Sequence, residues 1–263
     1  MFRWGILSTA KIAREHLIPA MQDSTNGIVA GIASRSRERA QKIADRFAIP
    51  HVYDSYDDLI NSADIDGVYI PLPTSQHSEW AIKAACAGKH VLCEKPIALA
   101  ASEIDGIINA RDENGVLVSE AFMVTYHPQW LKVRELLNDG VIGKLRLVQG
   151  AFSYFNTDPD NMRNIAQLGG GALRDIGVYP TVTTRFATQQ EPVRLRAEVD
   201  VSNDFGTDTF ANVTAEFPGF SMSFYVSTQL AMRQEMTFHG DKGRISLQAP
   251  FNAELYDMAR VNL

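Results

Sequence analysis

The sequence predicts an α/β protein in which a parallel sheet covered by helices precedes a second α/β part with a largely antiparallel, open sheet. Two observations carry this prediction. Over roughly the first 120 residues, short β-branched runs alternate with segments that repeat apolar residues at helical spacing, which is typical of βαβ units. After residue 122, apolar and polar residues alternate between turn signals, which is typical of antiparallel hairpins with one buried face.

The N-terminal part, residues 1–122, contains strand-like runs and helical patterns in strict alternation. The strand-like runs cover residues 5–7, 28–33, 67–70, 90–93 and 116–118. The helical patterns cover about 11–21, 37–47, 79–87 and 104–113. Because parallel strands need long crossover connections, this spacing predicts one parallel sheet with helices on both faces.

The C-terminal part, residues 123–263, mixes two helical patterns with strands. Helical spacing is found at about 129–137 and, after three consecutive glycines, at about 173–187, with a strand-like segment at 145–155 between them. The strand-like segment 221–227 has one face for the core and one left open, so we expect a homodimer or larger homo-oligomer to cover the second face. The chain ends shortly after a strand-like stretch, at a natural terminus or because a C-terminal portion is missing.

Composition excludes several classes of protein. The hydrophobic content is 45% and the charged content 21%, as in globular proteins. The net charge of −6 and the pI near 5.5 give no basic surface for nucleic acid or for an anionic membrane. Two cysteines, an N-terminus without signal-peptide character and the lack of a long apolar run lead us to expect a cytoplasmic protein without a membrane segment.

The turn after the first strand-like run occupies the position of a glycine-rich dinucleotide-binding fingerprint. Ser8 and Ala10 replace the first two glycines, and Ala13 stands at the third position. Small side chains still let a pyrophosphate approach the backbone at the start of a helix. An ordinary strand–helix turn is the alternative. The residues predicted to hold the pyrophosphate are Ser8, Thr9, Ala10, Lys11 and Ile12.

The end of the second strand indicates which dinucleotide is preferred. NAD-binding sheets usually carry an acidic residue there for the ribose 2′-hydroxyl, whereas this chain has Ser34 and Arg35. A serine hydroxyl and a guanidinium suit a 2′-phosphate, so we predict a preference for NADP over NAD. The alternative is a solvated first helical turn in which Ser36 acts as the N-cap.

A loop rich in proline follows the strand-like run at 67–70. In open α/β sheets such a loop lies at the carboxyl edge, where ligands bind. Pro71 and Leu72 are expected to line the cofactor, and Thr74 and His77 to touch its nicotinamide side. Alternatively, Thr74 or Ser75 caps the next helix.

Two long motifs resemble signatures of one family. Residues 87–96, AGKHVLCEKP, and residues 169–180, GGGALRDIGVYP, resemble the two signatures of the glucose-fructose oxidoreductase, inositol dehydrogenase and rhizopine catabolism (Gfo/Idh/MocA) family. Residues 120–123, EAFM, with HPQ at 127–129, are similar to its branch of dihydrodiol and xylose dehydrogenases.

The resemblance implies an N-terminal Rossmann dinucleotide-binding domain and a second domain that binds substrate and forms dimers. It implies a reaction that depends on NADP(H) or NAD(H) and acts on a sugar, a polyol or a related diol. It makes Lys95 the catalytic lysine, and it makes Asp175 and Tyr179, as the family's helix acid and its tyrosine or histidine, the other two catalytic residues. Glu94, Lys95 and Arg163 complete the expected cofactor-binding set, although Arg163 is equally compatible with a surface loop charge.

The chemistry of these residues is also reasonable without the family. Hydride transfer at a carbon–oxygen bond needs one proton added to or removed from the oxygen. A nearby ammonium helps a phenol to ionise, and Asp175 and Tyr179 are four residues apart in a predicted helix, hence on one face. Lys95 ends a strand, before a proline. A solvated lysine and a core tyrosine are the alternatives. No residues have metal-ligand spacing, so we expect no metal.

The sequence therefore predicts an oxidoreductase with a small-molecule carbohydrate or diol substrate and no nucleic-acid partner. A second hypothesis is a regulator that binds a dinucleotide without turnover, since fold alone does not fix function. A third is an enzyme that keeps its cofactor bound, oxidising one sugar and reducing another.

Overall fold

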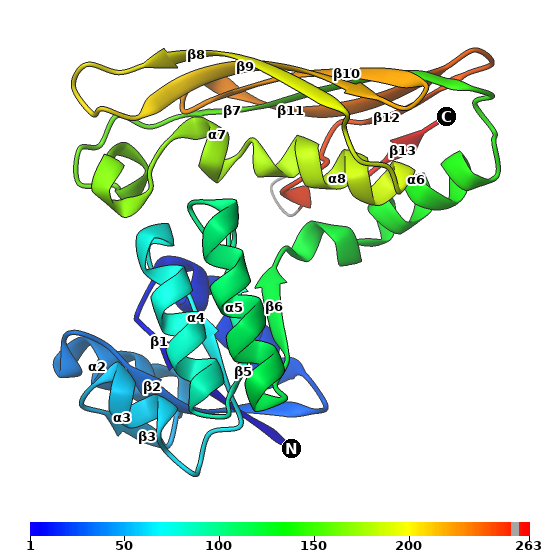
Figure 1. Cartoon of the computed structure of the whole chain (residues 1–263). Coiled ribbons are helices and arrows are strands. Elements are labelled where there is room, and N and C mark those ends of the chain that lie inside the picture. The colour runs from blue at the N-terminus through cyan, green and yellow to red at the C-terminus, as the bar shows by residue number, and fades with distance from the viewer. Residues whose placement is uncertain (254–257) are drawn as a thin grey trace. The chain divides into compact units, whose positions relative to one another are not determined.

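The computed structural model describes residues 1–253 and 258–263 (Figure 1). The chain divides into two compact units, Met1–Ala121 and Phe122–Leu263. Among the described residues, no helix is long and apolar enough to cross a membrane.

The first unit is built on a six-stranded parallel sheet with the strand order β3-β2-β1-β4-β5-β6. The strands are β1 (Phe2–Leu7), β2 (Gly27–Ala33), β3 (His51–Tyr53), β4 (Gly67–Ile70), β5 (His90–Glu94) and β6 (Val118–Ala121). The order reverses at β1, which lies between β2 and β4. This arrangement confirms the predicted parallel sheet, and it is the Rossmann fold.

Helices connect these strands, as the alternating pattern predicts. They are η1 (Ala13–Leu17), α1 (Ile18–Asp23), α2 (Arg37–Phe47), α3 (Tyr56–Ile60), η2 (Thr74–Gln76), α4 (His77–Cys86) and α5 (Ala101–Asn114). Neighbouring residues of one strand enter separate cores, because strand side chains alternate between faces. Ile6 of β1 packs in one cluster and Leu7 in another.

The second unit is built on a seven-stranded sheet with the order β13-β12-β11-β7-β10-β9-β8. The strands are β7 (Leu145–Phe155), β8 (Arg194–Val201), β9 (Asp208–Phe217), β10 (Phe220–Ser227), β11 (Gln229–Gly240), β12 (Arg244–Leu247) and β13 (Val261–Asn262). All neighbouring pairs of described strands are antiparallel except β7 and β10, which confirms the predicted, largely antiparallel sheet.

Helices of the second unit lie along one face of this sheet and leave the other face open (Figure 1). They are η3 (Met123–Tyr126), α6 (Pro128–Asn138), η4 (Met162–Asn164), η5 (Ala166–Leu168), α7 (Ala172–Asp175) and α8 (Val178–Thr188). On β10, Met222, Phe224 and Val226 are buried, whereas Ser221 and Ser223 belong to the opposite face. Strand β10 therefore has one buried apolar face, as expected from residues 221–227, and Ser221 and Ser223 on the other.

Candidate active site

The cofactor residues predicted in the first unit lie at the carboxyl ends of four neighbouring strands. Ser8 follows β1, Ser34 follows β2, Pro71 follows β4 and Lys95 follows β5. These strands are adjacent in the order β2-β1-β4-β5, at the point where the strand order reverses. Open α/β sheets bind ligands at this place, so the topology brings the predicted residues to one edge.

The turn after β1 has a glycine-like backbone although it holds a serine. The φ angle of Ser8 is 137°, in the region that favours glycine. The Ser8 hydroxyl accepts a hydrogen bond from the Ala10 N–H at 3.1 Å and donates one to the Pro71 carbonyl at 3.2 Å. A helix begins at Lys11 directly after this turn. The turn thus keeps the backbone path that a pyrophosphate-binding fingerprint needs.

Arg35 is an exposed arginine that follows the end of β2. Ser34 is buried, and its hydroxyl accepts from the Ser36 N–H at 3.4 Å, whereas Arg35 is exposed. Arg37 pairs instead with Asp54, a contact that holds it to the neighbouring strand end. Arg35, unlike Arg37, follows directly on Ser34 at the end of β2. The Ser36 hydroxyl caps α2 by accepting from Arg39 N–H, as the alternative proposed, and this cap involves neither Ser34 nor Arg35.

A tyrosine that sequence reasoning missed lies beside Arg35. Burial raises the pKa of Tyr56, and the charge and backbone N–H of Arg35 act in the opposite direction. The Tyr56 ring packs edge-on against Trp80 at 5.0 Å. Tyr56 comes from α3, a five-residue helix too short for its periodicity to be recognised.

His77, predicted to contact nicotinamide, is buried between two loops. Its side chain is in a residue only 1% exposed, with Nδ1 at 2.8 Å from the Pro96 carbonyl and Nε2 at 2.8 Å from the Leu72 carbonyl. Both ring nitrogens therefore contact backbone carbonyls, and the contact of His77 with nicotinamide stays a prediction. His77 joins the loop after β4 to the loop after β5. Thr74 is also buried, and α4 has no side-chain N-cap from Thr74 or Ser75.

The backbone around Lys95 is held by side chains at successive positions. The Lys95 N–H donates to Glu94 Oε2 at 3.2 Å, and the Tyr69 hydroxyl donates to Glu94 Oε1 at 2.6 Å. Tyr69 is fully buried, and burial together with the Glu94 charge raises its pKa, so it stays a proton donor to Glu94. Glu94 therefore supports the Lys95 loop from within the first unit.

Two more contacts complete this support. The Ile97 N–H donates to Glu120 Oε1 at 2.8 Å, and the Pro96 carbonyl meets His77 as described above. The peptide groups of Lys95, Pro96 and Ile97 are thus each bound by a different side chain. This arrangement limits the movement of the Lys95 backbone, so the position of the ammonium depends mainly on the conformation of the Lys95 side chain.

The second unit gathers three polar side chains around Asp175. Asp175 Oδ2 accepts from Arg163 Nε at 2.7 Å and from the Tyr154 hydroxyl at 2.8 Å. The Asp175 carboxylate raises the pKa of Arg163, and burial together with the same carboxylate raises that of Tyr154. Tyr179 lies close enough to affect the ionisation of both. Arg163, predicted as a cofactor ligand, is thus a partner of Asp175.

The three glycines before α7 explain how the Arg163 segment is held. A Cβ on Gly170 would lie 2.4 Å from the Arg163 carbonyl oxygen, too close for any side chain. The Gly171 N–H donates to that carbonyl at 3.0 Å, and the φ angle of Gly171 is 128°, which favours glycine. Asp208 then accepts from the Leu173 N–H at 2.6 Å at the start of α7. The glycines therefore allow the backbone that carries Arg163 to pack against α7.

The segment 173–187, predicted as one helix, forms two helices. The prediction that Asp175 and Tyr179 lie on one helical face is therefore wrong. α7 ends at Asp175 and α8 begins at Val178, so Asp175 and Tyr179 do not share a continuous helical face. Gly177 at the break lies against Leu173, whose carbonyl would be 2.5 Å from an added Cβ. The two residues are neighbours in space through Arg163 and Tyr154 rather than through helical spacing.

Tyr179 is anchored by aromatic rings. The residue is 9% exposed, and its ring lies 5.2 Å from that of Phe122, 5.3 Å from Phe152 and 5.3 Å from Phe251. Such contacts fix the orientation of the ring, and the hydroxyl is the group of Tyr179 that is able to transfer a proton.

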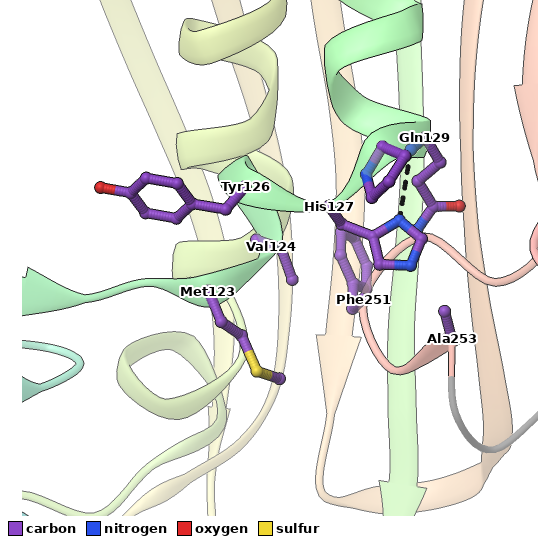
Figure 2. A pocket seen from close by; sticks show the side chains of 8 residues that line it. Met123, Val124, Tyr126, His127, Gln129, Phe251 and Ala253 are labelled. Carbon is purple, nitrogen blue, oxygen red and sulfur yellow. Dashed lines mark hydrogen bonds between the residues drawn. The ribbon is translucent and has the colours of Figure 1, made fainter. Parts of the chain in front are cut away.

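A hollow of about 330 Å³ opens beside the same aromatic cluster (Figure 2). It is lined by Met123, Val124, Tyr126, His127, Pro128, Gln129, Phe251 and Ala253. His127 Nδ1 accepts from the Gln129 N–H at 3.2 Å and caps α6. Figure 2 shows Tyr126 pointing away from this pair. Phe251 is common to the hollow and to the surroundings of Tyr179.

Among the described residues, no group of three or more histidine, cysteine, aspartate or glutamate side chains is placed to hold a metal ion. The chemistry that the arrangement can support is proton transfer and charge stabilisation by tyrosine, lysine, arginine and carboxylate groups.

Comparison with known proteins gives the family. Residues 2–122 match the oxidoreductase family with an NAD-binding Rossmann fold, GFO_IDH_MocA, and residues 130–246 match the GFO/IDH/MocA C-terminal domain. An uncharacterised oxidoreductase of Rhizobium meliloti is 43% identical over 264 residues, covering 100% of this chain and 79% of that protein. The D-xylose 1-dehydrogenase (NADP(+)) 2 of Haloferax volcanii is 34% identical, covering 95% of this chain and 77% of that protein.

A solved structure is similar to this chain in both fold and sequence. The crystal structure of a 3-ketoreductase from Actinomadura kijaniata in complex with NADP and TDP-benzene superimposes with a TM-score of 0.91 and 30% identity, covering 99% of this chain and 83% of that one. The predicted resemblance is confirmed. The chain belongs to the Gfo/Idh/MocA oxidoreductase family and is an NAD(P)-dependent oxidoreductase with a Rossmann domain at its N-terminus.

Proposed function

We propose that the chain transfers a hydride between NADP(H), in preference to NAD(H), and a sugar, polyol or related diol. The names of its relatives support this substrate class, because they act on xylose, on a keto sugar nucleotide and on a dihydrodiol. The observation that carries the proposal is the cluster in which Asp175 binds Arg163 and Tyr154 next to Tyr179. A regulator without turnover has no need of such a proton-handling group.

The cofactor preference rests on the end of β2. Arg35 is exposed there, Ser34 precedes it, and neither is an acid that would favour a free 2′-hydroxyl. The glycine-like turn at Ser8 and the helix starting at Lys11 fit the pyrophosphate. The bound nicotinamide supplies or accepts the hydride. The residues of this chain bind the dinucleotide, orient the substrate and move the proton.

We assign the proton transfer at the substrate oxygen to the hydroxyl of Tyr179. Lys95 orients the substrate and lowers the pKa of that phenol once substrate and cofactor are bound. Asp175 holds Arg163 and Tyr154 in place beside Tyr179 and so acts as a positioning residue. In the alternative within the same set, Lys95 carries the proton and Tyr179 only donates a hydrogen bond to substrate.

Two further properties belong to this proposal. The second unit assembles the chain into a homodimer or larger homo-oligomer. The enzyme works in the cytoplasm, for which both cysteines being free is the supporting observation, since a reducing compartment keeps thiols unpaired.

The test is a panel of sugars, polyols and dihydrodiols offered with NADP⁺ and with NAD⁺, followed by the absorbance of the reduced cofactor. On the best substrate, Tyr179→Phe should lower kcat by about 10²–10⁴, the range for lost general acid–base catalysis, and leave cofactor binding intact. Tyr225→Phe, on the open face of β10, is the matched control and should leave kcat unchanged.

The pH profile separates the two assignments of the proton. If Tyr179 carries it, Tyr179→Phe removes the ionisation seen in kcat, and Lys95→Ala shifts that ionisation to higher pH with a loss of rate at least as large. If Lys95 carries it, the ionisation survives in Tyr179→Phe. Near-normal turnover in Tyr179→Phe would contradict the proposal, and no turnover on the whole panel would favour the regulator.

A further inference from the structure

Arg163 is fixed at its backbone and at Nε, while its two terminal nitrogens stay available. Its N–H donates to Asn161 Oδ1 at 3.1 Å, and its carbonyl accepts from the Gly171 N–H at 3.0 Å. Its Nε donates to Asp175 Oδ2 at 2.7 Å. Among the described residues, neither Nη1 nor Nη2 of Arg163 has a hydrogen-bond partner, although these atoms carry most of the donors of a guanidinium.

The pair of Arg163 and Asp175 is exposed mainly on the arginine side. The side chain of Arg163 is 40% exposed, whereas that of Asp175 is 15% exposed. A surface arginine without a fixed partner changes its rotamer freely, and this freedom is lost when it binds a ligand. The charge-assisted hydrogen bond to Asp175 reduces this cost, so Arg163 is a preorganised donor that a ligand is able to reach from solution.

Arg163 also lies near the tyrosine to which the proton transfer is assigned. Tyr154 donates to Asp175 Oδ2 at 2.8 Å, and the same oxygen binds Arg163. The ring of Phe152 lies 6.4 Å from that of Tyr154 and 5.3 Å from that of Tyr179. Ionisation of Tyr179 raises the pKa of Arg163, an effect that requires the phenol and the guanidinium to be close. We therefore expect a substrate at the Tyr179 hydroxyl to have its neighbouring atoms beside Arg163.

The pair of Arg163 and Asp175 carries no net charge. The guanidinium and the carboxylate cancel, and Tyr154 stays neutral because burial and the Asp175 charge raise its pKa. An anionic group that approached Arg163 would also meet the repulsion of Asp175. A hydroxyl or carbonyl oxygen accepts a hydrogen bond from the guanidinium without that repulsion. The pair therefore favours a neutral oxygen over a carboxylate or a phosphate.

We propose that the terminal nitrogens of Arg163 bind the oxygen on the carbon next to the reacting carbon, and so make a second, adjacent oxygen a requirement of the substrate. This inference rests on the proposed function, in which Tyr179 moves the proton at the reacting oxygen of a sugar, polyol or diol. Such substrates carry oxygens on neighbouring carbons, whereas a simple alcohol does not. Arg163 is then a specificity-determining residue, and Asp175 and Tyr154 position it.

The size of the discrimination follows from the exposure of Arg163. A substrate without the adjacent oxygen covers the terminal nitrogens and offers them no acceptor. In a closed site such unpaired donors reject an analogue by several orders of magnitude. Because Arg163 is partly accessible, water replaces some of the lost contact, and we expect a preference of about 10–100-fold in kcat/KM.

The experiment compares the best substrate of the sugar and diol panel with its analogue that lacks the adjacent hydroxyl, using NADP⁺. Such analogues are 2-deoxy-D-glucose for D-glucose and cyclohexanol for trans-cyclohexane-1,2-diol. Arg163→Lys keeps a positive charge beside Asp175 but loses the terminal nitrogens, so the preference should fall by about tenfold or more, through loss on the hydroxylated member alone. Differences in intrinsic reactivity cancel when the two preferences are compared.

Arg233→Lys is the matched control, because Arg233 also contacts an acid and a tyrosine, Glu235 and Tyr225, but on the open face of the sheet. It should leave the preference unchanged, and Arg163→Lys should leave the affinity for NADPH unchanged in fluorescence titration. Lactate, which carries a carboxylate on the adjacent carbon, should be a poorer substrate than the neutral diols.

Four results would overturn the inference and leave the proposed hydride transfer in place. They are a best substrate without an adjacent oxygen, an equal loss on both members of a pair in Arg163→Lys, an NADPH affinity that falls as much as the preference does, and faster turnover of lactate than of the diols. An absence of turnover on the whole panel by the wild-type chain would contradict the proposed function as well.

Discussion

At Ser8, in the turn after β1, we predict that a glycine variant is more stable than an alanine variant, the reverse of the usual order. At most positions alanine is more stable than glycine, because glycine loses more backbone freedom on folding. At Ser8 the φ angle of 137° reverses this comparison, since a residue with a Cβ is strained there. We expect Ser8→Gly to be more stable than Ser8→Ala.

The magnitude follows from three contributions. Both variants lose the contacts of the Ser8 hydroxyl with Ala10 N–H and the Pro71 carbonyl, together about 1–2 kcal/mol. Glycine relieves a strain of about 1–3 kcal/mol and costs about 0.5–1 kcal/mol in backbone entropy. The glycine variant should therefore exceed the alanine variant by roughly 0.5–2 kcal/mol, and the alanine variant should be the least stable of the three.

The assay is thermal and urea unfolding of wild type and both variants. At roughly 2–4 °C per kcal/mol for a chain of this size, the glycine variant should melt a few degrees above the alanine variant. Ser119 in β6 is the control, because its backbone is an ordinary strand and alanine should be the more stable replacement there. An alanine variant at Ser8 as stable as the glycine variant would refute the strain argument.

Three further predictions concern Arg35, Tyr154 and Asp66. Arg35→Ala should weaken NADPH binding by about 1.5–3 kcal/mol and leave NADH binding nearly unchanged, and equal losses in calorimetric titration would contradict the 2′-phosphate assignment. Tyr154→Phe removes the 2.8 Å hydrogen bond to Asp175, so kcat should fall by less than in Tyr179→Phe; an equal fall would make Tyr154 a candidate for the proton transfer. Arg3 lowers the pKa of Asp66 from 3.8 to about 2, so this carboxylate stabilises the fold above pH 3.8 and loses that effect as the pH falls through about 2. Asp66→Asn should flatten the loss of stability on acidification over this range, and urea unfolding with an unchanged pH dependence would count against it.

The fold was predictable where the periodic pattern was long. The helix expected at 37–47 and the strand expected at 145–155 are observed as α2 and β7 with those bounds, because both segments are long enough for their apolar pattern to be recognised. β3 and α3 were not predicted, since three and five residues are too few to show the periodic apolar pattern of a strand or a helix.

The site was less predictable, because its contacts join residues that are distant in the chain. Tyr154 binds Asp175 across 21 positions, and His77 meets Pro96 across 19. No local pattern distinguishes such a tyrosine from a core residue or such a histidine from a ligand. The break at Gly177 was also hidden, since apolar spacing continues through it and only the packing against Leu173 explains it.

The position of His77 has a consequence for how two ligands would affect each other's binding. One imidazole connects the loop that is proposed to meet the cofactor with the loop that carries Lys95. A ligand that moves the first loop should therefore also move the second, because His77 contacts both. With the roles proposed for these loops, we expect cofactor and substrate binding to be thermodynamically linked, and by reciprocity each ligand should change the affinity of the other by the same factor. Weakening the contacts of His77 should then make the two binding events more independent while the residues that touch either ligand stay unchanged.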